Sequence, residues 1–257
     1  MVVPPLPGCI PPATLFRNRH NAAMATPFIF EQLFDDESST LTYIVGDVAT
    51  REAAIIDPVD HQLERDLAVL VRHGLRLKYA LETHAHADHI TSSGLLRQRT
   101  GALAAAPFNC GVTPADIHLE EGATLALGGE TLQVIETPGH TAGSVCYLWR
   151  DAVFTGDTLF IGGCGRADFQ GGSASELYDS ITQRLFALPD ATRVYPGHDY
   201  KGNRVSSIGV EKSSNPRLAG KSRDEFIALM AALNLPRPKL MDVAVPANRN
   251  LGLPQGG

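Results

Sequence analysis

Short apolar runs rich in β-branched residues alternate along the chain with segments whose apolar residues recur at the helical period. The short runs predict β-strands over residues 41–45, 53–56, 77–81, 132–135, 145–149, 152–154 and 193–195. Helical periodicity predicts helices over residues 63–73, 89–100, 176–188 and 225–233. Strands interleaved with helices indicate a layered α/β or α+β domain.

The two ends of the chain lack this pattern. Five prolines fall within the first twelve positions, and the first 26 residues contain two arginines but no acid. We interpret residues 1–26 as a disordered leader or the result of a misassigned start, since Met24 opens a plainer sequence. Residues 27–257 then form one domain with a short C-terminal extension. We expect the tail after Pro236 to be irregular and to pack on the body through its apolar residues.

Composition and charge exclude several classes of protein. A hydrophobic fraction of 44% and a net charge of -6 are those of a folded domain and not of a disordered chain. No apolar run approaches the roughly 18 residues needed to cross a bilayer, and no cluster of Lys and Arg marks a nucleic-acid surface. The four cysteines form no C-x-x-C pair, which favours a reducing compartment. We predict a cytoplasmic protein, because the leader lacks the amphipathic periodicity of a transit segment and Met24 is a credible start; the alternative is a mitochondrial protein if the leader is a transit segment.

Three histidines and an aspartate lie within six positions, shortly after the predicted strand at 77–81. The segment T-H-A-H-A-D-H contains His84, His86, Asp88 and His89. Imidazole and carboxylate groups together are typical ligands of first-row transition metals. Structural loops rarely concentrate these residue types, so the segment predicts a metal site.

Three further predicted strands are each followed by Gly or Pro and then by a metal-capable side chain. These side chains are His140, Asp157 and His198. Strand ends at one edge of a sheet can converge on one site, so we expect these residues to join the histidine cluster. The donors suffice for two metal ions, and spacing alone leaves the number and identity of the metals open.

The motif order, H-x-H-x-D-H followed by His, Asp and His, resembles the signature of the metallo-β-lactamase superfamily. The resemblance covers the chain from about residue 28 onward. It implies an α+β fold, the αβ/βα four-layer sandwich, in which two sheets pack face to face with helices outside and metal at the sheet edge. Residues 27–257 would then be a metallo-β-lactamase-like catalytic domain.

Shorter motifs resemble one branch of this superfamily, the persulfide dioxygenases. The run G-G-C-G-R at 162–166 looks like both glyoxalase II and the dioxygenases, whereas the following A-D-F-Q looks like the dioxygenases. Further similar motifs lie in the C-terminal half, where glyoxalase II carries a different and longer helical domain. They are P-G-H-D-Y-K-G at 196–202, N-P-R-L at 215–218 and A-V-P-A-N at 244–248.

The resemblance implies a non-haem Fe(II) enzyme that oxidises glutathione persulfide with O₂ to sulfite and glutathione, a reaction of sulfide catabolism. One Fe(II) per chain would be bound by His84, His140 and Asp157, which are also the expected catalytic residues. The other donors would surround these ligands or occupy a second-metal position: His86, Asp88, His89 and His198. The family also implies a homodimer.

Four other residues are expected near the substrate. Arg166 is a candidate for binding a glutathione carboxylate, since guanidinium pairs with carboxylates in a bidentate manner. A surface ion pair fits Arg166 equally well on local sequence. Tyr200 and Arg217 are further expected pocket residues. Cys164 lies between glycines near the expected metal and is a candidate redox-sensitive thiol, although a small buried side chain fits the same position.

The main alternative is a binuclear zinc hydrolase of glutathione thioesters, like glyoxalase II, in which a metal-bound water attacks the thioester. Asp168, Phe169 and Gln170 and the short C-terminal region disfavour it. A third interpretation is a non-catalytic module that binds a metal or a thiol. The loss of a metal-ligand residue from the motifs would favour it, but every motif ligand is present. The acidic charge disfavours a nuclease, and the Gly-Cys-Gly-Arg run disfavours a β-lactamase.

Overall fold

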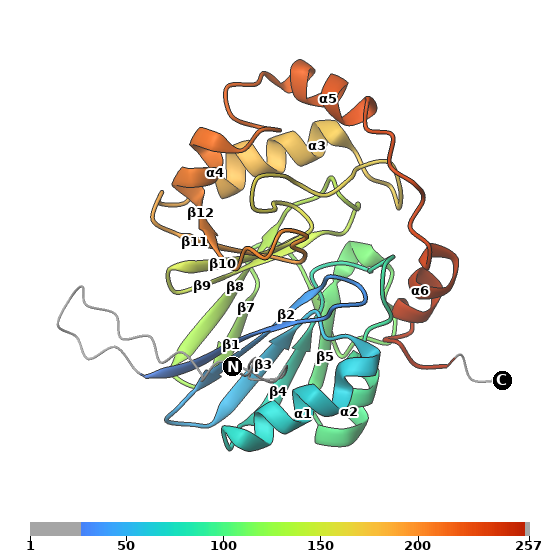
Figure 1. Ribbon diagram of the computed structural model, residues 1–257. Coiled ribbons are helices and arrows are strands. Elements are labelled where there is room, and N and C mark those ends of the chain that lie inside the picture. The colour runs from blue at the N-terminus through green and yellow to red at the C-terminus, as the bar shows by residue number, and fades with distance from the viewer. Residues whose placement is uncertain (1–26, 255–257) are drawn as a thin grey trace, which may run out of the picture.

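The computed structural model describes residues 27–254, which contain two six-stranded sheets packed face to face (Figure 1). In the first sheet the strands follow one another in chain order, with antiparallel pairs from β1 to β3 and parallel pairs from β3 to β6. These strands are β1 (Phe28–Phe34), β2 (Leu41–Asp47), β3 (Glu52–Ile56), β4 (Arg76–Leu81), β5 (Leu103–Pro107) and β6 (Ile117–Leu119). The predicted leader, residues 1–26, lies outside the described residues.

The second sheet has the order β12-β11-β10-β9-β8-β7. Its strands pair antiparallel except for β10 and β11, which run parallel. They are β7 (Thr124–Leu127), β8 (Glu130–Glu136), β9 (Val145–Trp149), β10 (Ala152–Gly156), β11 (Arg193–Pro196) and β12 (Ser206–Ser207). The parallel pair matters for the site, because it brings the ends of β10 and β11 side by side.

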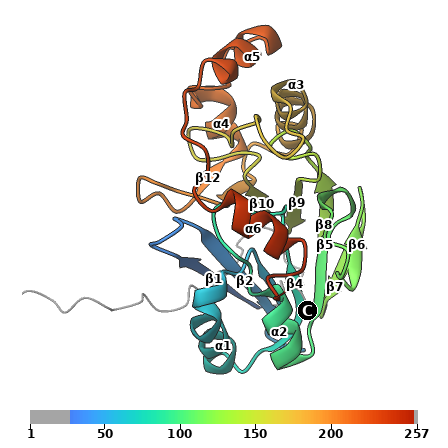
Figure 2. The same cartoon turned by 90° about the vertical axis from the view of Figure 1, so that its right-hand side faces the viewer.

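Helices cover the outer faces of both sheets. In Figure 1, α1 (Leu63–Arg72) and α2 (Ser93–Thr100) lie below the first sheet. Three helices lie above the second sheet: α3 (Ala174–Asp179), α4 (Ile208–Ser214) and α5 (Arg223–Ala231). The last helix, α6 (Met241–Asn248), lies at the side of the sandwich and faces the viewer in Figure 2.

Three large apolar clusters separate these layers. The central one joins the inner faces of the two sheets through side chains such as Tyr43, Trp149 and Phe154. A second cluster lies between the second sheet and the helices above it, and a third lies between the first sheet and the helices below it. Each layer buries its apolar face against the next. The predicted α+β four-layer sandwich is therefore confirmed.

The helix predicted at 89–100 begins later than expected. The structure starts α2 at Ser93, and the residues from His84 to Ser92 form bends and irregular backbone with an isolated bridge at Thr91. The polar residues of this segment engage one another: the Nδ1 atom of His89 lies 2.8 Å from the Asp88 carboxylate. Because the Asp88 carboxylate contacts the neighbouring His89 ring, it is not available to cap a helix that begins at residue 89. The helical periodicity therefore predicted a start that is four residues too early.

The tail after Pro236 is not irregular throughout, because residues 241–248 form α6. Its docking on the body is confirmed, since Leu251 is fully buried and joins a cluster that includes Ala85. The predicted helix at 176–188 is divided between α3 and a π-helical segment, Ser180–Leu185. The strands β1, β5, β6, β7 and β12 were missed, and β5 is rich in alanine, which carries little β-signal.

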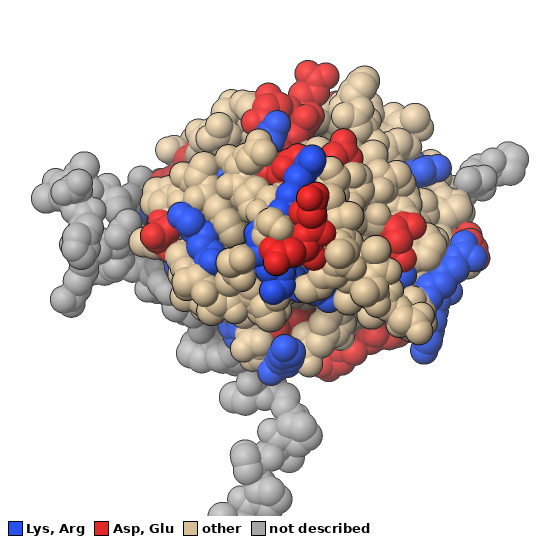
Figure 3. All heavy atoms as spheres, turned by 90° about the horizontal axis from the view of Figure 1, so that it is seen from above, with Lys and Arg blue, Asp and Glu red and all other residues tan. Residues whose placement is uncertain are grey.

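Charged residues do not segregate by sign on the face seen in Figure 3, where Lys and Arg side chains are interspersed with Asp and Glu. Ion pairs among exposed side chains include Arg223–Asp179 and Arg184–Glu121. A broad basic patch that could track phosphates is therefore missing from this face. Among the described residues, no helix is long and apolar enough to span a membrane.

A buried acid on α1 makes the stability of the fold dependent on pH. Asp66 is fully buried; its Oδ1 atom accepts a hydrogen bond from Arg65 at 2.9 Å, and its Oδ2 atom has no hydrogen-bond partner. Burial raises the pKa of Asp66 to about 6, against about 3.9 in an unfolded chain. At a pH below the unfolded pKa, Asp66 is neutral in both the folded and the unfolded chain. As the pH rises toward the folded pKa, the unfolded chain loses this proton first, so the free energy of unfolding falls.

We expect Asp66→Asn to become more stable relative to wild type as the pH rises from about 4 to about 7. The gain in relative free energy of unfolding should be roughly 2–3 kcal/mol, which corresponds to about two pKa units. Urea unfolding at the two pH values measures it, with the exposed Asp224→Asn as control. An equal difference between Asp66→Asn and wild type at both pH values would contradict the prediction.

Candidate metal centre

The strands that precede the predicted donors end at one edge of the sandwich. His84 follows β4, His140 follows β8, Asp157 follows β10 and His198 follows β11, each within four residues of the strand end. The parallel pairing of β10 and β11 places the last two side by side, and the amide of Gly197 donates to the Gly156 carbonyl at 2.7 Å. The predicted convergence of strand ends is confirmed.

One group of donors consists of His84, His140 and Asp157. One ligand atom from each residue lies within 4.8 Å of the other two. The Nε2 atom of His140 is 3.6 Å from the Asp157 Oδ2 atom, and the rings of His84 and His140 meet edge to face with centroids 4.8 Å apart. Two imidazoles and one carboxylate at this spacing can share one metal ion.

Hydrogen bonds to the Nδ1 atoms of His84 and His140 determine which ring nitrogen is left free for a metal. The Nδ1 atom of His140 lies 2.6 Å from the backbone carbonyl oxygen of Arg166, which can only accept, so Nδ1 carries the proton. The hydroxyl of Thr83 donates to Asp57 at 2.8 Å and accepts from the Nδ1 atom of His84 at 3.0 Å. In both rings the Nε2 lone pair is therefore free for a metal.

Two glycines allow the backbone to pack closely around Asp157. A Cβ atom at Gly165 would lie 2.3 Å from the Asp157 carbonyl oxygen and 2.8 Å from the His140 Nδ1 atom. A Cβ atom at Gly197 would lie 2.7 Å from the Asp157 Oδ1 atom. A side chain at either position would displace a donor, which gives a physical reason for glycine in the G-G-C-G-R and P-G-H-D-Y motifs.

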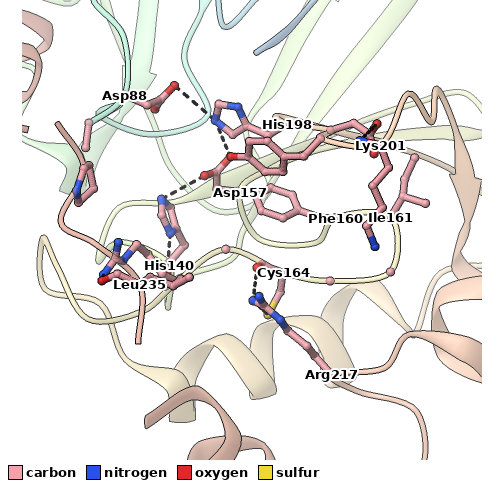
Figure 4. Close-up of a pocket in the computed structure, with 18 of the residues that line it drawn as sticks. Asp88, His140, Asp157, Phe160, Ile161, Cys164, His198, Lys201, Arg217 and Leu235 are labelled. Atoms are coloured by element: carbon pink, nitrogen blue, oxygen red, sulfur yellow. Dashed lines mark hydrogen bonds and ion pairs between the residues drawn. The ribbon is translucent and has the colours of Figure 1, made fainter. Parts of the chain in front are cut away.

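A second set of donors adjoins the first (Figure 4). The Nε2 atom of His198 lies 3.5 Å from Asp88 and 3.4 Å from Asp157. His86, Asp88 and His89 also bring one ligand atom each within 4.8 Å of the others. Burial raises the pKa of Asp88, but the rings of His89 and His198 outweigh it and hold that pKa well below its ordinary value. The fold thus brings all seven predicted donors together.

His86 is held by two carboxylates that the sequence motifs did not reveal. Its Nε2 atom lies 3.1 Å from Asp57 and 3.2 Å from Glu82, and all three residues are buried. Burial lowers the pKa of His86, but the two carboxylates outweigh it, so the pKa lies well above its ordinary value. Both acids directly follow a strand, β3 or β4, and the strand-end rule applied to acids would have found them.

A pocket of about 550 Å³ opens onto the metal donors. Asp88, His140, Asp157 and His198 line one part of it. Apolar and cationic side chains line the rest, among them Phe160, Ile161, Lys201, Arg217 and Leu235. A concave site of this size with a few convergent polar groups is typical of small-molecule binding.

Comparisons with known proteins agree with this geometry. A family model described as the metallo-beta-lactamase superfamily matches residues 35–107 and 109–198. Human mitochondrial persulfide dioxygenase ETHE1 is 44% identical over 229 residues, which cover 88% of this chain and 90% of the human protein. The chain belongs to the persulfide dioxygenase family. The predicted family is confirmed.

Solved structures of related proteins have the same fold as this chain. The crystal structure of ETHE1 from Myxococcus xanthus is 56% identical with a TM-score of 0.86, and the match covers 88% of this chain and 100% of that one. A metallo-beta-lactamase from Staphylococcus aureus is 26% identical with a TM-score of 0.81, covering 87% of this chain and 73% of the other. The metallo-β-lactamase fold of this persulfide dioxygenase family member is therefore confirmed, and the chain is an enzyme of the oxidoreductase class.

Arg166 already has a carboxylate partner within the chain. Its guanidinium makes two contacts with Asp168, at 2.6 and 2.7 Å, and donates to the carbonyl oxygen of Pro236 at 2.7 Å. An internal ion pair, the alternative considered for this residue, is therefore present. Arg166 also anchors the segment that contains Leu235 and Pro236, and this segment lines the pocket of this persulfide dioxygenase family member.

The other expected pocket residues differ in their surroundings. Arg217 lines the pocket and donates to the Cys164 carbonyl oxygen at 2.6 Å. Tyr200 is exposed and stacks on His198 with ring centroids 6.0 Å apart. Cys164 is buried, and burial raises the pKa of its thiol. The Cys164 environment fits a small buried side chain better than a reactive thiolate.

Arg166→Ala should raise the KM for a persulfide substrate roughly three- to tenfold, because the pocket segment at Leu235 and Pro236 loses its anchor. Metal content should stay at the wild-type level, since His140 bonds the backbone carbonyl of residue 166, which the variant keeps. Steady-state kinetics and metal analysis test both expectations. Arg184→Ala, which removes a surface ion pair with Glu121, is the matched control, and an unchanged KM in Arg166→Ala would remove Arg166 from the pocket.

Proposed function

We propose that this member of the persulfide dioxygenase family oxidises glutathione persulfide with O₂ and water to sulfite and glutathione. In this proposal one Fe(II) is bound by His84, His140 and Asp157, which are the catalytic residues. The observation that carries the proposal is the donor set: two imidazoles with free Nε2 atoms and one carboxylate beside an open pocket. Two histidines and one carboxylate with open positions are typical of non-haem Fe(II) oxygenases.

Bound Fe(II) would supply oxygen activation, and the chain's own residues hold and orient its ligands. The Arg166 carbonyl keeps the proton of His140 at Nδ1, and the Thr83 hydroxyl does the same for His84. Both rings thereby keep the same nitrogen, Nε2, free for a metal. Ring orientations that hydrogen bonds fix before metal binds favour affinity.

The pocket suits a substrate with carboxylates at one end and an apolar middle. Lys201 and Arg217 are cationic groups in its wall, and glutathione carries two carboxylates that such groups can pair with. Phe160 and Ile161 provide apolar parts of the pocket wall, and Phe160 lies beside Asp157. An apolar wall near the expected metal would exclude water that competes with the terminal sulfur of the substrate. We propose that Arg217 and Tyr200 contact the glutathione moiety, with Arg166 acting on the same pocket through its anchored segment.

A binuclear zinc thioesterase is the second candidate, and specific atoms favour it. The Nε2 atom of His89 and the Nδ1 atom of His86 are buried without a hydrogen-bond partner. Such atoms fit a second cation, which would lower the pKa of a bound water for attack on a thioester. The two functions differ in metal content and in the need for O₂.

Metal content and oxygen uptake of the enzyme purified without air decide between them. Our proposal expects about one iron per chain, O₂ consumption on addition of glutathione persulfide, and formation of sulfite. About two zinc per chain, no oxygen uptake and hydrolysis of a glutathione thioester would overturn it. Adding Fe(II) or Zn(II) separately to the metal-free protein controls for loss of metal during purification.

Assembly and location stay predictions. We propose a homodimer, which light scattering on the purified protein tests. We propose a cytoplasmic location, with mitochondria as the alternative; the human, bovine and mouse relatives carry the word mitochondrial in their names. Fractionation of cells that express the full chain tests the location.

A further inference from the structure

One carboxamide at the end of α6 binds the backbone of the histidine segment at three points. The Nδ2 atom of Asn248 donates to the carbonyl oxygens of His86 at 2.9 Å and His89 at 2.8 Å. Its Oδ1 atom accepts from the amide of Thr91 at 2.9 Å. The Asn248 side chain is buried, so these bonds do not compete with water. Both amide hydrogens and the carbonyl of this one side chain are used.

The bonded groups bracket Asp88, one of the residues that surround the proposed ligands, and lie close in sequence to the ligand His84. Asp88 lies between the two carbonyl groups that Asn248 binds, and His84 lies two residues before the first of them. Apart from an isolated bridge between Thr91 and Val59, no helix or strand ladder holds the backbone of this stretch in place. Its shape therefore depends on bonds from elsewhere, and Asn248 supplies three of them from about 160 positions away along the chain.

The C-terminal segment is packed too closely on this stretch to be a loose tail. The amide of Gly94 donates to the Leu251 carbonyl oxygen at 2.9 Å. A Cβ atom at Gly252, where φ is +73°, would lie 1.9 Å from the Thr91 carbonyl oxygen. Leu251 shares an apolar cluster with Ala85, the residue between the first two histidines. The segment is thus fitted to the metal-donor stretch on both its polar and its apolar sides.

We propose that Asn248 is a positioning residue for the metal centre. It fixes the backbone from His86 to Thr91, whose side chains contact the proposed ligands and their neighbours. The ring of His86 lies 4.1 Å, centroid to centroid, from that of the ligand His84. The Asp88 carboxylate lies 3.5 Å from the His198 Nε2 atom, which is itself 3.4 Å from the ligand Asp157. Metal affinity thereby depends on the docked C-terminal helix. This inference rests on the metal centre of the proposed function, but it concerns a residue that touches neither metal nor substrate.

Binding of Co(II) to the metal-free protein tests the proposal without using oxidation activity. Partners that orient ligands typically contribute about 10–100-fold to metal affinity. We expect Asn248→Ala to raise the dissociation constant for Co(II) about tenfold or more and to change the visible absorption bands of the bound Co(II), which report ligand geometry. Measurements are made at a temperature where circular dichroism shows each variant to be folded.

Asn250→Ala is the matched control, because this asparagine lies in the same segment and its side chain bonds the tail carbonyls of Leu253 and Pro254. It should bind Co(II) as wild type does. Asn248→Ser, which retains one donor, should give an intermediate dissociation constant and serves if Asn248→Ala does not fold. Failure of both Asn248 variants to fold would assign the residue to overall stability and overturn the proposal.

Two further outcomes are informative. A wild-type dissociation constant and spectrum in folded Asn248→Ala, whatever its melting temperature, would overturn the positioning role. An equal weakening in Asn250→Ala would also overturn it, since tail docking in general would then be responsible. If wild-type protein itself binds no Co(II), the metal centre of the proposed function fails, and this result is distinct from a failure of the Asn248 inference alone.

Discussion

Asp157→Ala should lose both its metal and its activity. Asp157 supplies the carboxylate of the donor group, and its two oxygens lie 3.6 Å from the His140 Nε2 atom and 3.4 Å from the His198 Nε2 atom. Without it, His84 and His140 are left without the carboxylate of their donor group. The loss should exceed the 10–100-fold that is typical for removal of a group that merely orients a ligand.

The measurement pairs metal content with turnover. We expect iron in the purified variant to fall below about a tenth of the wild-type level, with oxygen uptake at background. Asp190→Ala, which removes an exposed carboxylate paired with Lys212, should retain both. Iron at full occupancy in Asp157→Ala would remove this residue from the ligand set, whereas full occupancy without turnover would give it a role in the reaction alone.

Thr83→Val should weaken the metal centre although it removes no ligand. The valine keeps the shape of threonine but lacks the hydroxyl, which donates to Asp57 and accepts from the Nδ1 atom of His84. Both partners are buried. We expect metal affinity to fall about 10–100-fold, because the ring of His84 loses the bond that orients it. The free energy of unfolding should also fall by about 1–3 kcal/mol, since buried polar atoms are left unpaired.

Isothermal titration with Co(II) and urea unfolding of the metal-free protein separate the two effects. Thr182→Val is the control, since its hydroxyl bonds only the Tyr178 carbonyl within a helical segment away from the site. It should reduce stability slightly and leave metal affinity unchanged. A Thr83→Val variant with wild-type affinity would show that the ring of His84 is held well enough by packing.

The donors could be predicted because each follows a strand along the chain. The apolar runs that form β4, β8, β10 and β11 are visible in the sequence, and the next His or Asp marks the site. Asp57 and Glu82 obey the same rule, but a single acid after a strand is common and no motif drew notice to either. Local pattern failed at α2, where side chains of the metal stretch bond one another and delay the helix until Ser93.

The role of Arg166 could not be predicted in this way. Its sequence neighbourhood is compatible both with a substrate carboxylate and with an internal ion pair, and only the fold shows that Asp168 and the carbonyl of Pro236 already occupy the guanidinium. The same holds for Cys164, whose burial and raised pKa depend on side chains such as Met230, distant in sequence.

The sequence by itself predicted a layered domain of strands and helices and the seven candidate metal donors, and its short motifs carried the resemblance that implied the α+β sandwich and the family, because strand periodicity and short motifs are local properties of the chain. The tertiary structure alone decided which ring nitrogens of His84 and His140 stay free of hydrogen bonds, which groups within the chain Arg166 binds and what holds the histidine stretch. These depend on hydrogen bonds between residues as far as 162 positions apart, as between Asn248 and His86. Local periodicity carries no information about such partners, since only the folded chain brings their polar atoms within bonding distance.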